Sequence, residues 1–236
     1  MASQAKKPKP VYSVAPAANG YAVQADGAPM KTPASESFVV PTQQLAETIV
    51  DEWQAQGDKI NPDSMPMTQL AATSIDIAGK NRDKITDQLL AYIGSELLCH
   101  RADEPAELVA LQKQEWQPLL DWCEQHFDVL MLAGSGIMPI KQQQDTYDNL
   151  RHALGRYDVF QLTGLRQAVE VSGSLVLGLA LIEKHATPDQ VFAASELDAT
   201  FQMQKWGEDP ASTHRRTTAK RELEICARWF DLLNAA

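Results

Sequence analysis

The sequence predicts an α+β protein that is mostly α, with a small N-terminal β domain followed by a larger helical domain. An Asp-Gly pair near residue 26 lies between two extended runs, which is typical of a β-hairpin. After Pro41 the alternation gives way to apolar residues at helical spacing. The composition, 44% apolar over 236 residues, allows a sizeable core. We expect a flexible tail at 1–10, a β domain at 11–41 and a helical domain at 42–236.

The β region is predicted from its alternation and its turn. Tyr21, Val23 and Ala25 alternate with small or polar residues, and Asp26-Gly27 follows directly. A type I′ turn requires positive φ at both central residues, a conformation that this pair adopts readily. Phe38–Val40 is a further short strand, which Pro41 ends.

The first half of the helical region follows a regular spacing. Leu45, Ile49 and Trp53 recur every four residues, and Gly57 ends this helix. Pro118 lies inside a later helical pattern, where we expect a kink or a restart. Further helices are expected at 67–78, 85–93, 105–127 and 145–157, and a strand at 129–133.

The second half contains the most apolar helix of the chain. One helix is expected over 160–184, and from Gly173 it is apolar on nearly every side, as in the centre of a bundle. Thr187-Pro188 opens the next helix, which we expect to end at Gly207. The last helix begins near Pro210, and its inner stripe is Ala219, Leu223, Cys226, Phe230 and Leu233.

Charge and composition exclude several classes of partner. The formal net charge of −10 disfavours nucleic acid and anionic membrane surfaces. The most apolar run, Gly173–Ile182, is shorter than the roughly 20 residues of a spanning helix. No secretory signal is visible and the three cysteines are scattered, so we expect reduced thiols in the bacterial cytoplasm. The alternative is the mitochondrial matrix, if a presequence is missing.

The chain contains few signs of catalysis. It has no GxxxxGK, GxGxxG, HExxH or GxSxG motif. Cys123 and His126 have the spacing of half a metal site, but no second ligand pair exists. Cys99 precedes His100 and Arg101, whose charges favour a reactive thiolate. We expect no enzyme, metal or cofactor; the alternative is an enzyme that uses Cys99 or an unrecognised pocket.

A protein-binding surface is the stronger interpretation of one helical segment. Asp198, Gln202 and Trp206 lie four residues apart and share one helix face, while Leu197 and Phe201 form the neighbouring core stripe. An indole supplies contact area, and the polar groups fix the register of a partner. The alternative is an ordinary half-exposed helix whose tryptophan covers the edge of the core.

Four segments, in order along the chain, resemble a known family. They are Asp26–Pro33, then Val40–Gly57, then Leu97–Pro105 with Glu115–Leu120, and finally Phe201–Gly207. They resemble the chaperones that assemble the α subunit of ATP synthase, called assembly factor 2 in animals. The chain departs from the family at Ala28, where an arginine is usual, and at His100, where an aromatic residue is usual. Asp198 is the one acidic residue where the family carries several.

The resemblance implies a chaperone that binds the unassembled α subunit and releases it to the β subunit, without nucleotide hydrolysis. An unpaired α subunit exposes an apolar interface, and such surfaces aggregate. We expect a monomer, and a generic protein-binding adaptor is the remaining alternative. Trp53 lies in a matched segment but shares its face with core residues, and Lys31 is exposed beside the hairpin turn. The candidate client-binding residues are Asp198, Gln202, Trp206, Lys205, Trp53 and Lys31.

Overall fold

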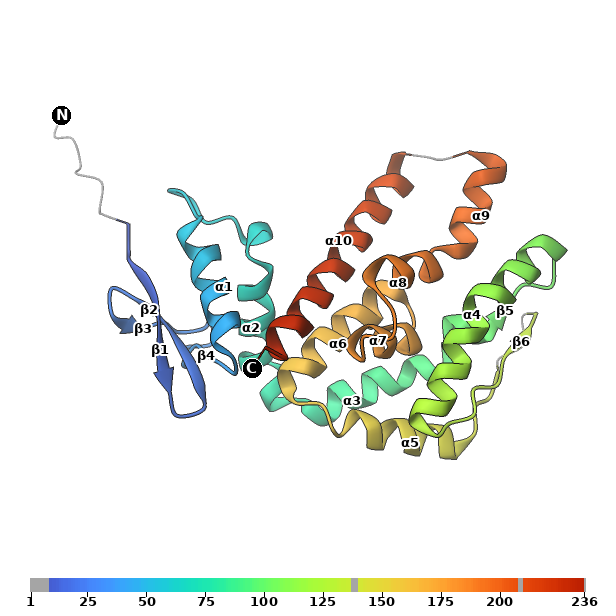
Figure 1. Ribbon diagram of the computed structural model, residues 1–236, viewed down its shortest axis with the longest axis horizontal. Coiled ribbons are helices and arrows are strands. Elements are labelled where there is room, and N and C mark those ends of the chain that lie inside the picture. Colours follow the sequence, from blue (N-terminus) through green and yellow to red (C-terminus); the bar gives the residue numbers. More distant parts are fainter. Residues whose placement is uncertain (1–8, 137–139, 208–209, 236) are drawn as a thin grey trace. The chain divides into compact units, whose positions relative to one another are not determined.

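The computed structural model describes residues 9–136, 140–207 and 210–235, which form two compact units (Figure 1). The first unit comprises 9–77 and 231–235, and the second comprises 78–230. An antiparallel sheet precedes a series of helices, so the predicted fold class is confirmed. Of the predicted tail at 1–10, residues 1–8 lie outside the described residues.

The sheet of the first unit is built around its second strand. β2 (Gly20–Ala25) pairs antiparallel with β1 (Tyr12–Ala17) along its whole length. On its other side, β2 pairs with the short strands β3 (Ala28–Pro29) and β4 (Val39–Val40). β1 therefore lies at the edge of the sheet.

The turns of the sheet depend on residues that accept positive φ. Asp26 and Gly27 have φ of 50° and 77° between the paired residues Ala25 and Ala28, so the predicted hairpin is confirmed. Gly20 has φ of 134°, and a Cβ there would lie 2.2 Å from the carbonyl oxygen of Val40. Only glycine fits this position without moving the backbone.

Two helices complete the first unit. α1 (Gln43–Gln54) buries Leu45 and Ile49, and α2 (Pro66–Asp76) packs beside it. The side chain of Thr42 caps α1 by accepting a hydrogen bond from the N–H of Leu45. The first compact unit therefore extends past Pro41 and includes these two helices. The boundary predicted at Pro41 marks only the change from strand to helix. An independently folding domain at 11–41 stays a prediction.

The second unit is almost entirely helical. Its helices are α3 (Arg82–Ala91), α4 (Ala106–Phe127), α5 (Gln144–Leu154), α6 (Val159–Ser172), α7 (Leu175–Ile182), α8 (Pro188–Ser195), α9 (Leu197–Trp206) and most of α10 (Pro210–Leu233). Short 3-10 turns occupy Pro62–Ser64 in the first unit and Ala78–Lys80, Tyr92–Ser95 and Leu97–Cys99 in the second. α4 continues through Pro118, so no restart occurs there.

The helix predicted over 160–184 is two helices. α6 ends at Gly173, which has φ of 71°, and Ser174 caps α7 by accepting a hydrogen bond from the N–H of Leu177. Every residue of α7 is buried, which confirms the predicted apolar helix at the centre of the helices. A Cβ on Gly178 would lie 2.5 Å from the side chain of Val169, so this glycine lets α6 and α7 approach closely.

Two further predictions are wrong. The helix expected from Pro188 to Trp206 is interrupted at Glu196, which separates α8 from α9. The segment 129–133 is no strand, because the side-chain amide of Gln142 satisfies the N–H and the carbonyl of Leu132. The strand lies just beyond it, where β6 (Gly134–Ser135) pairs in parallel with β5 (His100–Arg101).

Candidate protein-binding surface

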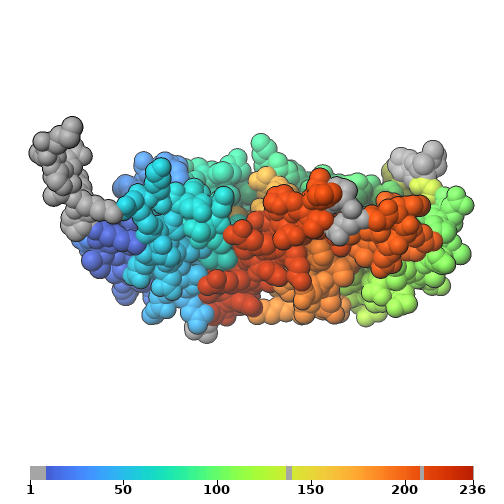
Figure 2. Space-filling model, turned by 90° about the horizontal axis from the view of Figure 1, so that it is seen from above, coloured from blue at the N-terminus to red at the C-terminus, as the bar shows by residue number. Residues whose placement is uncertain are grey.

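The surface predicted on one helix face lies on α9. Leu197 and Phe201 are buried, as expected, while Gln202 and Trp206 are exposed. Trp206 keeps 77% of its surface exposed, more than any other large apolar residue that the structure describes. Figure 2 shows α9 and the first half of α10, coloured orange to red, on the surface of the second unit. Gln202, Lys205 and Trp206, with Asp198 at the half-buried end, are called the α9 surface below.

Asp198 is held in place by a hydrogen-bonded chain to α4. Its Oδ1 accepts a hydrogen bond from Nε2 of Gln112 at 2.8 Å, and Gln112 is 1% exposed. The Oε1 of Gln112 in turn accepts from the N–H of Ala102 at 2.8 Å, and its carbonyl accepts from Arg101 at 2.6 Å. Because the Gln112 amide is buried and needs an acceptor, Asp198 has a structural role in addition to its half-exposed carboxylate.

Lys205 fixes the other end of α9. Its Nζ lies 2.8 Å from Oε2 of Glu107 on α4 and 4.5 Å from the centre of the Phe201 ring. The hydrogen bond from Lys205 lowers the pKa of the Glu107 carboxyl. Since both side chains face solvent, this ion pair orients Lys205 more than it stabilises the fold. Together, Asp198 and Lys205 attach both ends of α9 to α4.

Sequence reasoning missed the carboxylate at which α9 begins. Glu196 is 8% exposed, and its two oxygens accept hydrogen bonds from Arg215 at 2.7 Å each. Arg216 adds a third at 2.9 Å and also donates to Thr200 at 3.0 Å. The hydrogen bonds to Glu196 raise the pKa of Arg215. The available signal was a pair of adjacent arginines, but they follow Glu196 by 19 and 20 residues, a spacing that fits no local helix rule.

The two remaining candidates, Trp53 and Lys31, belong to the first unit. Trp53 is half-buried on α1, and its ring centre lies 5.5 Å from that of Tyr12. Its indole N–H is buried and meets no hydrogen-bond acceptor among the described residues. Lys31 is exposed and donates to the carbonyl of Ser35 at 3.2 Å. Trp53 thus covers an edge of the core, and Lys31 forms a hydrogen bond within its own turn.

A second buried carboxylate, Glu96, was also missed. It is 1% exposed and accepts hydrogen bonds from the hydroxyl of Ser174 and from the N–H groups of Leu175 (2.9 Å) and Val176 (3.4 Å). These donors form the N-terminus of α7, whose partial positive charge favours an anion. Burial nevertheless dominates and raises the pKa of Glu96 to about 7.

The alternative of an enzyme that uses Cys99 loses its chemical basis. Cys99 is 1% exposed, and burial, together with the negative charge of Glu96, raises the pKa of its thiol to about 12. A thiol with such a pKa is not a thiolate at neutral pH. Over the described ranges, no group of three or more histidine, cysteine or acidic side chains is arranged to hold a metal ion.

Among the described residues, no helix is both long enough and apolar enough to cross a bilayer.

Known proteins share both the sequence pattern and the fold. A model of the ATP12 chaperone protein family matches residues 8–124. Atp12 from Paracoccus denitrificans is 31% identical, with a TM-score of 0.91 over 94% of this chain and 96% of that one. A mutant of that protein with an aspartate replaced by lysine has the same TM-score.

Two fungal proteins are more distant relatives. The mitochondrial atp12 protein of Schizosaccharomyces pombe is 24% identical over 78% of this chain and 68% of its own length. The mitochondrial ATP12 protein of Saccharomyces cerevisiae is 24% identical over 79% of this chain and 71% of its own length. The bacterial match, 31% identical over nearly the whole of both chains, shows that this chain belongs to the ATP12 chaperone family of F1-ATPase assembly factors.

Proposed function

We propose that this chain binds the unassembled α subunit of the F1-ATPase through the α9 surface and releases it to the β subunit. The family supports a role in assembly, and the sequence resemblance implies the α subunit as client. The observation that carries the choice of surface is Trp206, a large aromatic side chain that is 77% exposed. Such a residue is costly to leave in water and is characteristic of the energetic centre of an interface.

The attachment of α9 to α4 supports this choice. Hydrogen bonds at Asp198 and Lys205 hold the helix at both ends, so Gln202 and Trp206 have a fixed backbone beneath them. A fixed backbone lowers the entropy that docking must remove. Asp198 also offers its Oδ2 to a client donor, since no hydrogen bond to that atom is made by the described residues.

The client is released when the β subunit competes for it, without a chemical step. The β subunit covers the same apolar interface of the α subunit that a chaperone would protect. A modest chaperone affinity lets the β subunit displace it by mass action. This scheme uses neither a nucleotide nor a catalytic side chain.

The proposal is tested by capture of the client and by variants of the α9 surface. Tagged chain added to an extract should retain α subunit that is free of β subunit. With purified α subunit, Trp206→Ala should weaken binding by at least about tenfold, as for an interface anchor. Leu130→Ser removes another exposed apolar side chain of the second unit and should leave binding unchanged.

Asp198 requires two variants because it also contacts Gln112. Asp198→Lys should weaken binding strongly, whereas Asp198→Asn keeps an oxygen that can accept from Gln112 and removes only the charge. Circular dichroism must show that both variants remain folded. Normal capture of the α subunit by folded Asp198→Lys and Trp206→Ala proteins would rule out this surface. A failure of the wild-type chain to bind α subunit would rule out the client itself.

A further inference from the structure

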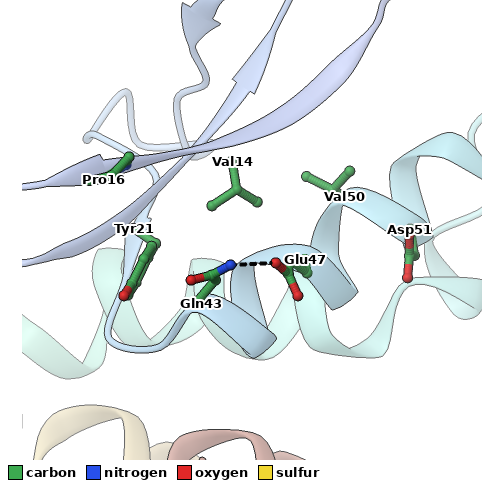
Figure 3. Close-up of a pocket in the computed structure, with 7 residues that line it drawn as sticks. All are labelled: Val14, Pro16, Tyr21, Gln43, Glu47, Val50 and Asp51. Carbon is green, nitrogen blue, oxygen red and sulfur yellow. Dashed lines mark hydrogen bonds between the residues drawn. The ribbon is translucent and has the colours of Figure 1, made fainter. Parts of the chain in front are cut away.

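A groove in the first unit, lined by none of the residues of the α9 surface, has features of a peptide-binding site. It lies between the sheet and α1 and has a volume of about 390 Å³. Figure 3 shows Val14 and Tyr21 directed from the strands toward α1, which carries Glu47, Val50 and Asp51. The lining residues are Val14, Pro16, Tyr21, Gln43, Glu47, Val50 and Asp51.

The groove is negatively charged, and none of its described lining residues is a lysine or an arginine. Glu47 and Asp51 are exposed and one helical turn apart on α1. Glu47 accepts a hydrogen bond from the amide of Gln43 at 2.7 Å, and neither carboxylate forms an ion pair with a described lysine or arginine. The walls beside them are the apolar parts of Val14, Val50 and Tyr21. An apolar wall that ends in carboxylates suits a lysine or arginine, whose alkyl stem packs while its cation reaches the acids.

Among the described residues, no strand pairs with the outer edge of β1, the strand that borders the groove. Val14 pairs with Val23, and Val23 bonds away from β1, donating to the carbonyl of Phe38 at 3.1 Å and accepting from the N–H of Met30 at 2.8 Å. In an antiparallel pair, such a residue faces a partner whose own N–H and carbonyl point out of the sheet. The N–H and carbonyl of Val14 therefore lie on the open edge, where a partner strand can pair with them.

The short length of the open edge limits how many residues of a partner strand can pair with β1. Pro16 has no N–H to donate, and the carbonyl of Tyr12 is already within 3.4 Å of the Gln54 side-chain amide. Only the middle of β1 is open. A residue placed opposite Val14 would direct its side chain to the same face of the sheet, into the groove.

We propose that this groove binds a short extended segment of a partner protein, with its backbone paired to Val14 and a lysine or arginine side chain lodged against Glu47 and Asp51. The site is separate in its residues from the α9 surface and does not depend on the identity of the client. It adds strand pairing to the recognition that a helix surface provides.

Synthetic peptides test the charge and the strand pairing. The probe is the acetylated and amidated pentapeptide Thr-Val-Lys-Val-Thr, with its lysine at the centre. Replacing that lysine with norleucine keeps the whole alkyl stem and removes only the charged ammonium group, and should weaken binding by about tenfold. Replacing it with glutamate should abolish binding, and added salt should weaken the lysine peptide.

Variants of the protein test the site. The double variant Glu47→Gln with Asp51→Asn should bind the lysine peptide about tenfold more weakly. Asp58→Asn removes a charge from an exposed residue of the same unit that does not line the groove, and should leave the affinity unchanged. Both acids of the groove are exposed, so the double variant should melt like the wild type.

Hydrogen exchange measured by NMR gives an independent readout, because strand pairing should protect the Val14 amide when the lysine peptide is bound. Equal affinity of the lysine and norleucine peptides would overturn the proposal. So would an unchanged affinity of the double variant, or an unprotected Val14 amide. A homodimer that dissociates in the double variant would show that a second copy occupies the groove, which also overturns it.

Discussion

The second unit contains two buried glutamates, Glu96 beside the N-terminus of α7 and Glu196 at the N-terminus of α9. Different groups stabilise the two carboxylates. Glu96 is 1% exposed at the N-terminus of α7 and is bonded by a hydroxyl and backbone N–H groups. Glu196 is 8% exposed at the start of α9 and is bonded by Arg215 and Arg216. Without a cation, burial raises the pKa of Glu96 to about 7. The charge of Glu96 should therefore change near neutral pH, whereas the ion pairs of Glu196 link α9 to α10.

The largest expected effect is the loss of Glu96. In Glu96→Ala, the hydroxyl of Ser174 and the N–H groups of Leu175 and Val176 lose their acceptor in a buried site. We expect the free energy of unfolding to fall by about 4 kcal/mol, measured by chemical denaturation. Glu96→Gln keeps one acceptor oxygen and should cost about half as much. A loss below about 1 kcal/mol for the alanine variant would show that water replaces the carboxylate.

The second effect is a dependence of stability on pH. The folded pKa of Glu96, about 7, lies above its ordinary value of 4.5, so between these values the folded chain binds a proton that the unfolded chain has lost. The free energy of unfolding should therefore fall as pH rises from 4.5 to 7, by at most about 3 kcal/mol, and then level off. Denaturation of the wild type and of Glu96→Gln at several pH values isolates this contribution. Parallel curves for the two proteins would contradict it.

The smallest effect concerns the ion-paired glutamate. Glu196→Ala leaves Arg216, whose side chain is 15% exposed, without its carboxylate, and should cost about 2 kcal/mol. Arg215 has a side chain that is 57% exposed, so Arg215→Ala should cost less than about 1 kcal/mol. Thermal melting of both variants measures the order. A larger loss for Arg215→Ala than for Glu196→Ala would contradict this order.

The sequence was sufficient for elements that local chemistry determines. Asp26-Gly27 specifies its hairpin, and the spacing of Leu45 and Ile49 places α1. Gly173 before Ser174 was the signal for a helix end followed by a helix start, but the continuous apolar spacing concealed it. Glu96 completes that break from 78 residues away, which no local pattern reveals.

The candidate surface was also predictable in part, because local spacing determines which residues of a helix are buried. Helical periodicity correctly separates the buried Leu197 and Phe201 from the exposed Gln202 and Trp206. It cannot show that Asp198 is bonded to Gln112, because that contact joins residues 86 apart. The break at Glu196 has neither glycine nor proline, and depends on arginines that the fold brings near.

The exposure of Trp206 makes the chain its own optical sensor. Of the five tryptophans, Trp116 and Trp229 are fully buried and Trp53 and Trp122 are partly covered, while Trp206 is 77% exposed. A soluble quencher such as acrylamide will reach Trp206 first, and its red-shifted emission should dominate the quenched fraction. A protein that docks on α9 would shield this indole and shift its emission to the blue. Docking at the groove of the first unit would leave the signal of Trp206 unchanged.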